Sequence, residues 1–146
     1  MAYKNASSTY KETKVKTAGQ GQLIVMLYDE AVRQLTIAAE LLGLNKNDKK
    51  DPGRIEQISK AVMKTEEILT ELMVSLDFEQ GGEISKNLFS LYTWFNRELL
   101  EANINQDSGR MITVRNMLSD LRNTWSTVAS QSPKDHHAAV GLNIAG

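Results

Sequence analysis

The segment from Gly81 to Asn103 carries the widest apolar pattern of the chain. Its apolar residues recur at steps of three and four, the spacing of one helix face: Ile84, Leu88, Leu91, Phe95, Leu99 and Ala102. A second set widens this stripe on its flank: Phe89, Tyr92 and Leu100. A helix that is apolar over so much of its circumference needs more than one neighbour. It therefore lies at the centre of a bundle, or part of it is left for a partner.

The same spacing predicts three more helices. The first begins near residues 17–21, where Thr17 or Gly19 is expected to cap it, and ends by about 43–47. In the other two helices, inward-facing residues recur at alternating steps of three and four. One helix carries Ile55, Ile58, Val62, Thr65, Leu69, Leu72 and Leu76. The other carries Met111, Val114, Leu118, Leu121, Trp125 and Val128. Asp107 or Ser108 is expected to cap the last helix, and 77–82 is expected to be a turn. Because the connections are short, the sequence predicts an all-α fold, an antiparallel up-down four-helix bundle with a flexible N-terminal arm and an irregular C-terminal tail.

Three parts follow from this pattern: a mobile arm over residues 1–16, the bundle over 17–131, and a tail over 132–146. In the polar arm, Tyr10 either packs locally or lies over a groove of the bundle as a displaceable aromatic anchor. In the tail, apolar residues recur at steps of two: Val140, Leu142 and Ile144. Either the tail is disordered, or these residues form an extended strip that docks in an apolar groove of its own or of a neighbouring molecule.

Composition narrows the range of partners and compartments. Seventeen basic and 18 acidic residues give a net charge of −1, which offers no general attraction to nucleic acid or to an anionic membrane. No apolar run approaches the roughly 20 residues of a membrane helix, and the N-terminus has no apolar signal core. The chain has no cysteine, which fits a reducing compartment. We therefore expect a cytoplasmic protein of the cytosol, with no membrane insertion and no nucleic-acid partner.

The sequence lacks the patterns of catalytic and metal-binding sites. Both histidines, His136 and His137, lie in the tail, so no helix carries the Glu-x-x-His pair of a di-iron bundle. The Gly-Gln-Gly segment at 19–21 lacks the lysine and the further glycine of a phosphate-binding loop. Adjacent acidic residues such as Glu66 and Glu67 point about 100° apart on a helix and cannot share a ligand. We expect no enzymatic activity, no metal and no cofactor.

Aromatic and methionine residues exceed what four narrow seams between helices require. They are Met26, Tyr28, Met63, Met73, Tyr92, Trp94, Met117 and Trp125. Most such residues in helical proteins are ordinary core, but methionine and amphipathic aromatics also suit surfaces that are covered only part of the time. A bundle with an apolar groove can bind a helix of a partner. The alternative is a self-associating structural bundle, which pairs with its own copy as a weak homodimer.

Three stretches, taken in order, resemble one known family, the bacterial flagellin export chaperones (FliS). They are residues 15–18 with 23–32, residues 72–84 with 87–92, and residues 99–103 with 118–125. Each stretch alone is a common leucine-rich pattern, so the resemblance depends on their combined order and spacing over about residues 10–126.

The resemblance implies a cytoplasmic bundle that binds the disordered C-terminal segment of flagellin, prevents premature polymerisation and presents the subunit to the export gate. Ordering a disordered segment consumes much of the gross interaction energy, so a large apolar contact area is needed. We expect Tyr10 to be a displaceable lid over the binding surface. The other expected partner-binding residues are Ile24, Tyr28, Ile68, Tyr92, Trp94 and Phe95. Asn103 is expected instead to bond near a helix end, and Trp125 to lie in the core.

Overall fold

The computed structural model describes residues 2–47 and 51–130, with side chains from 21 to 45 and from 51 to 130. Four α-helices fill these ranges: α1 spans Ala2–Asn47, α2 spans Pro52–Val74, α3 spans Phe78–Asn105 and α4 spans Ser108–Ala129. The predicted all-α four-helix bundle is confirmed. Within the described residues, no helix is long and apolar enough to cross a membrane.

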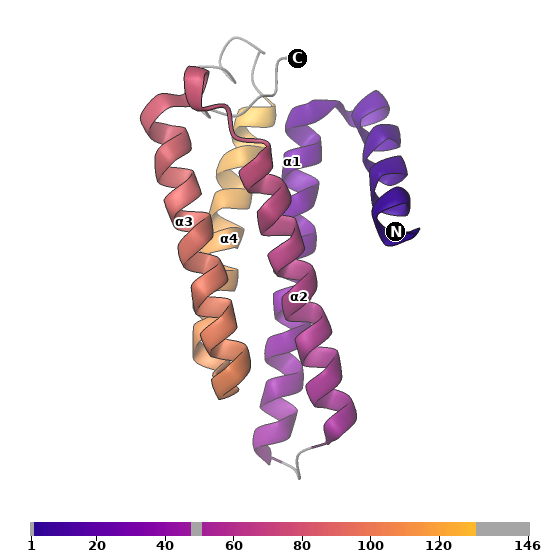
Figure 1. Cartoon of the computed structure of the whole chain (residues 1–146), viewed down its shortest axis with the longest axis vertical. Helices are drawn as coiled ribbons and strands as arrows, with labels where there is room; N and C mark the ends of the chain where they lie inside the picture. Colours follow the sequence, from indigo (N-terminus) through magenta and orange to yellow (C-terminus); the bar gives the residue numbers. More distant parts are fainter. Residues whose placement is uncertain (1, 48–50, 131–146) are drawn as a thin grey trace.

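The helices form a closed antiparallel ring (Figure 1). Helix α1 packs against α2 and α4, and α3 packs against the same two helices from the other side. Helices α1 and α3 are therefore diagonal partners across the core. The indigo N-terminal part of α1 turns back at one end of the bundle and stands beside it.

Helix α1 begins at Ala2, so the predicted start near residues 17–21 and its cap at Thr17 or Gly19 are wrong. Residues 2–16 contain no proline or glycine, so this segment is able to form helical turns ahead of the point where the chain turns back (Figure 1). The assignment of residues 1–16 as a mobile arm stays a prediction. The side chain of Tyr10 and the whole tail 132–146 lie outside the described residues.

An aspartate caps the N-terminus of each of the last three helices. Asp51 Oδ1 accepts from the amide of Gly53 at 2.9 Å, and Asp77 Oδ1 accepts from the amides of Glu79 and Gln80 at 3.0 Å. Asp107 Oδ1 accepts from the amide of Arg110 at 3.2 Å, which confirms the predicted cap of α4. Each cap satisfies amides that the helix itself leaves without a partner, and it stabilises the helix by about 1 kcal/mol.

Helix α3 is kinked at Gly82, whose φ of 50° and ψ of −120° lie outside the helical region. Glycine adopts this conformation readily because it has no Cβ. The Ser85 hydroxyl donates to the carbonyl of Asp77 at 2.8 Å and closes the kink. The predicted turn at 77–82 is therefore a capped helical turn followed by a kink.

The buried residues follow the predicted stripes of α2 and α4, except that Ile55 is exposed and Leu121 is half-buried. In α3 the predicted stripe is correct only for its second half, at Phe95, Leu99 and Ala102. In the first half, the buried residues are Ser85 and Tyr92, while Ile84 is exposed and Leu88 and Leu91 are half-buried. At the kink, the Ser85 side chain points inward and hydrogen-bonds to Asp77, and Tyr92 has a polar partner inside the core. These two residues therefore take the buried positions that were expected for Leu88 and Leu91.

Adjacent leucines of α3 provide a matched test of the core. Leu99 is fully buried, whereas Leu100 is 52% exposed. We expect Leu99→Ala to lower the free energy of unfolding by about 2–5 kcal/mol, because it removes apolar contacts and leaves a cavity. The control, Leu100→Ala, has the same helix propensity change and should stay within about 0.5 kcal/mol of the parent. Urea unfolding followed by circular dichroism measures both, and equal losses would contradict this packing.

Candidate functional site

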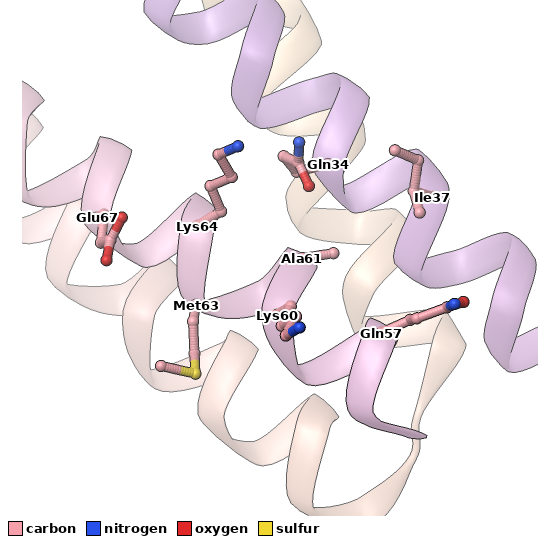
Figure 2. Close-up of a pocket in the computed structure, with 8 residues that line it drawn as sticks. All are labelled: Gln34, Ile37, Gln57, Lys60, Ala61, Met63, Lys64 and Glu67. Carbon is pink, nitrogen blue, oxygen red and sulfur yellow. The ribbon is translucent and has the colours of Figure 1, made fainter. Parts of the chain in front are cut away.

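A groove of about 450 Å³ lies between α1 and α2. Its apolar lining comes from Ile37, Ala61 and Met63, and its polar lining comes from Gln34, Gln57, Lys60, Lys64 and Glu67. Figure 2 shows that Met63 points away from Ile37 and Gln34, along the outer side of α2. The buried Gln34 side chain is fixed in place by a hydrogen bond within α1, in which its Nε2 donates to Glu30 Oε1 at 2.8 Å. The groove therefore has an apolar centre with long charged side chains along its rim.

A second apolar surface follows the seam between α2 and α3. Ser59 Oγ donates to Asn103 Oδ1 at 3.5 Å, which places these two residues opposite one another. Exposed apolar residues lie near this pair on the outer surface of the two helices. On α2 they are Ile55 and Met63, one turn either side of Ser59, and on α3 they are Phe89, Leu100 and Ile104, of which Leu100 is one turn from both Asn103 and Ile104. We call these five residues the α2–α3 face. Met63 is 58% exposed and joins this face to the groove.

Ion pairs join α4 to both of its neighbours. Arg122 Nε donates to Asp29 Oδ1 at 2.6 Å between α4 and α1, and Arg110 Nη1 lies 3.7 Å from Glu98 Oε2 between α4 and α3. Arg110 Nη1 also lies 4.0 Å from Glu101 Oε2. On the α3-facing side of α2, Glu66 is half-buried, and this burial raises the pKa of its carboxyl group. The α2–α3 seam therefore combines exposed apolar groups with a half-buried carboxyl group.

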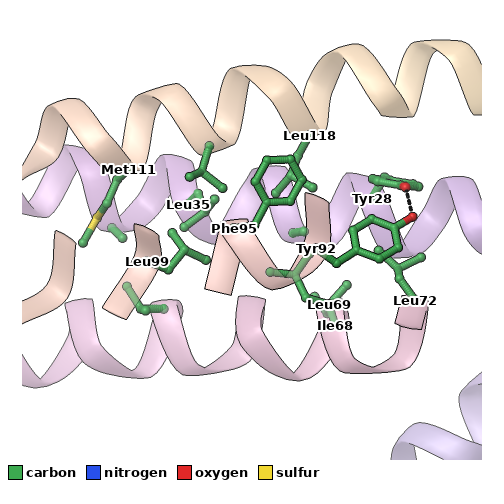
Figure 3. Packing of buried hydrophobic residues seen from close by; sticks show 14 of the residues in the cluster. Tyr28, Leu35, Ile68, Leu69, Leu72, Tyr92, Phe95, Leu99, Met111 and Leu118 are labelled. Atoms are coloured by element: carbon green, nitrogen blue, oxygen red, sulfur yellow. Dashed lines mark hydrogen bonds between the residues drawn. The ribbon is translucent and has the colours of Figure 1, made fainter. Parts of the chain in front are cut away.

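Two tyrosines meet inside the core. Tyr28 on α1 and Tyr92 on α3 are fully buried, and their hydroxyls share a hydrogen bond, drawn as a dashed line in Figure 3. Trp125 on α4 donates from Nε1 to the Tyr28 hydroxyl at 3.2 Å, and its ring stacks on Tyr28 with the centroids 6.4 Å apart. A polar cluster of three residues therefore joins three helices.

Burial controls the ionisation of both tyrosines. Desolvation raises the pKa of Tyr28 to about 12, although its hydrogen bonds to Tyr92 and Trp125 act in the opposite direction. Burial also raises the pKa of Tyr92, and the neighbouring Tyr28 adds to that increase. Both hydroxyls are therefore neutral near pH 7 and serve as hydrogen-bonding groups. Among the described residues, no cluster of three or more histidine and acidic side chains could hold a metal ion.

The predicted partner-binding residues occupy different environments. Five are buried in the core: Ile24, Tyr28, Ile68, Tyr92 and Phe95. Trp94 is half-buried, with its ring tilted against Phe95 at a centroid distance of 5.8 Å. A partner would reach the five buried residues only if helices separated, so their binding role stays a prediction. The structural roles expected for Trp125 and Asn103 are confirmed, because Trp125 lies in the core and Asn103 bonds Ser59 near the end of α3.

Phe89 and Leu100 are exposed where the sequence predicted a flank of the α3 stripe. Ile55, the first residue of the predicted α2 stripe, is exposed too, and Ile104 lies beyond the last residue of the predicted α3 stripe. Sequence reasoning missed Ile104 and Ile55 as surface groups because periodicity alone does not show how far a helix extends beyond its neighbours. Their positions near helix ends were the available signal.

Removal of the two hydroxyls should have unequal effects. Tyr28→Phe leaves the Tyr92 hydroxyl and the Trp125 N–H without their buried partner, so we expect a loss of about 1–3 kcal/mol in unfolding free energy. Tyr92→Phe keeps the bond from Trp125 to Tyr28 and should lose only about 0.5–1.5 kcal/mol. Chemical denaturation at pH 7, followed by tryptophan fluorescence, gives both values. A larger loss for Tyr92→Phe would contradict the central position of Tyr28.

Alkaline pH should unfold the bundle through these tyrosines. The pKa of Tyr28 rises from 10.0 to about 12 on folding, so above pH 10 the unfolded chain releases a proton that the folded chain retains. Stability is therefore unaffected by this group below pH 10 and falls by about 1.4 kcal/mol per pH unit between pH 10 and 12. Tyrosinate absorbance and helical circular dichroism should change together for the two buried tyrosines. If all tyrosines ionise near pH 10 while the helix signal persists, the burial is wrong.

Comparison with known proteins agrees with this architecture. Residues 3–132 match the family described as "Flagellar protein FliS". The flagellar secretion chaperone FliS of Salmonella typhimurium is 37% identical over 123 residues, which cover 84% of each chain. The flagellar secretion chaperone FliS of Bacillus subtilis is 28% identical over 142 residues, covering 97% of this chain and 99% of that protein. The helical bundle and these matches together show that the chain belongs to the FliS family of flagellar secretion chaperones.

Proposed function

We propose that this protein is a cytoplasmic export chaperone that binds the disordered C-terminal segment of flagellin. Binding keeps flagellin from polymerising prematurely, and the complex is handed to the flagellar type III secretion apparatus, whose export gate is a second partner. Membership of a family of secretion chaperones supports this role. The structural observation that carries the proposal is the α2–α3 face, where large apolar side chains remain exposed on a bundle whose core is otherwise complete.

The α2–α3 face has the dimensions of a helix-binding surface. Phe89 and Ile104 are 15 residues apart on α3, which corresponds to roughly 22 Å, or about four helical turns. An amphipathic helix of that length can lay its apolar side along the seam. The adjoining groove between α1 and α2 extends the contact beyond Met63. A client that continues across both surfaces gains the large contact area that ordering a disordered segment demands.

Apolar burial dominates the proposed binding energy. Burying an apolar side chain stabilises a complex by about 25 cal/mol per Å² removed from water. Burial of apolar groups does not depend on charge, so the affinity should change only mildly with ionic strength. The buried residues predicted to bind, such as Tyr92 and Phe95, then act indirectly by holding α3 in position. Trp94 is half-buried on α3 and keeps part of its ring accessible. Tyr10 remains our proposed lid over part of this surface.

Calorimetry with the C-terminal fragment of flagellin from the same organism tests the proposal. Phe89 is 44% exposed, and completing its burial is worth roughly 1 kcal/mol, which corresponds to about a fivefold change in Kd. We therefore expect Phe89→Ser and Leu100→Ser each to weaken binding by about fivefold. The matched control, Ile112→Ser, removes an exposed apolar residue from α4 and should leave the affinity unchanged.

Size-exclusion chromatography of the same samples separates the competing function. A chaperone should elute as a one-to-one complex with the fragment and show no concentration-dependent dimer in its absence. A dimer that forms at high concentration and binds no fragment would instead identify a self-associating bundle. Equal affinities for Phe89→Ser and Ile112→Ser would exclude the α2–α3 face as the binding surface.

A further inference from the structure

A smaller group of exposed apolar residues lies at the connection between α2 and α3. Val74 is 81% exposed at the end of α2, and it lines a shallow depression of about 300 Å³ together with Phe78. The rings of Phe78 and Phe89 meet edge to face with their centroids 6.1 Å apart. We call Val74, Phe78 and Phe89 the end cluster. These three exposed side chains lie close together, beside the polar groups of Ser75, Asp77 and Glu79 at the same connection.

The chain itself continues from the same end of the bundle. Helices α3 and α4 are antiparallel neighbours, so α4 ends at Ala129 beside the start of α3 at Phe78 (Figure 1). The sequence then runs through residues 131–146. Val140 follows Ser130 by ten residues, which can span roughly 33–36 Å when extended. Adjacent helices lie only about 8–10 Å apart, so the apolar part of this segment reaches the end cluster with slack.

The pattern of the tail fits the shape of the cluster. Val140, Leu142 and Ile144 alternate with smaller or polar residues, so an extended backbone would place all three side chains on one face. This face would be roughly 13 Å long at the usual rise of a strand. The rings of Phe78 and Phe89 are 6.1 Å apart, and Val74 lines the same depression as Phe78. An apolar strip of roughly 13 Å is therefore long enough to contact all three residues of the cluster.

We propose that the segment Val140–Ile144 docks on the end cluster of its own molecule and covers Val74, Phe78 and Phe89. Because the segment is covalently attached to the bundle by only about ten residues, its effective concentration at the cluster is in the millimolar range, which a free partner rarely reaches. A weak apolar contact is therefore sufficient within one molecule.

Paramagnetic broadening tests the docking on the full-length chain. The protein has no cysteine, so Asn143→Cys provides a single attachment site for a nitroxide label between Leu142 and Ile144. We expect a several-fold loss of amide peak intensity in 15N-labelled protein around residues 74–89, recovered when the nitroxide is reduced. The opposite end of the bundle, at residues 51–59 and 105–109, should keep its intensity. Absent or uniform broadening would overturn the proposal.

Two controls test whether the broadening comes from apolar docking and whether the docking occurs within one molecule. Adding Leu142→Ser and Ile144→Ser to the labelled chain should abolish the broadening without affecting the bundle, because both changes lie outside it. Broadening that survives these changes would show that apolar docking is not its cause. A mixture of 15N-labelled parent protein and unenriched, spin-labelled protein should show no broadening. If it does, the tail docks on a neighbouring copy, and docking within one molecule is refuted. All these measurements are made without flagellin, so their outcome is independent of the client-binding test.

Discussion

The hydroxyl contact between Tyr28 and Tyr92 sets the register of this bundle. It crosses the core between the diagonal helices α1 and α3, and Trp125 adds a third hydrogen-bonding group from α4. Buried polar groups without partners are strongly destabilising, so the helices are held where these three groups meet. Sliding one helix by a single residue would turn its tyrosine by about 100° and separate the hydroxyls. The apolar residues of the core therefore pack around a polar centre that specifies their alignment.

This register also determines which apolar residues stay outside. Directing Tyr92 and Ser85 inward turns Phe89 and Leu100 towards the α2–α3 seam. On the opposite side, the Asp29–Arg122 ion pair closes α1 against α4. The bundle is thus closed along one seam and apolar at the surface along another. Under the proposed function, this asymmetry would allow a client to cover the exposed side chains while the core of the bundle stays intact.

The sequence predicted the architecture well, because heptad spacing in α2 and α4 directly reports the buried face, as at Leu69 and Leu118. It also located the Asp107 cap from residue type alone. The stripe predicted for α3 was wrong in its first half, where local rules compete with tertiary contacts. In α3, the leucine spacing favoured Leu88 and Leu91, but the Gly82 kink and the Tyr28–Tyr92 bond rotate the helix differently. The predicted binding set was chosen for aromatic and apolar character, and periodicity cannot distinguish a residue that packs within the chain from one that awaits a partner.

The polar cluster in the core also has a kinetic consequence. Tyr28 and Trp125 are separated by 97 residues, and Tyr28 and Tyr92 by 64. Closing such long loops costs more chain entropy than forming either helical hairpin, so the hairpins should assemble first and the cluster should close late. Interactions that are absent from the folding transition state act mainly on the rate of unfolding. The two tyrosines and Trp125 therefore slow the unfolding of the chaperone and have little effect on its folding rate.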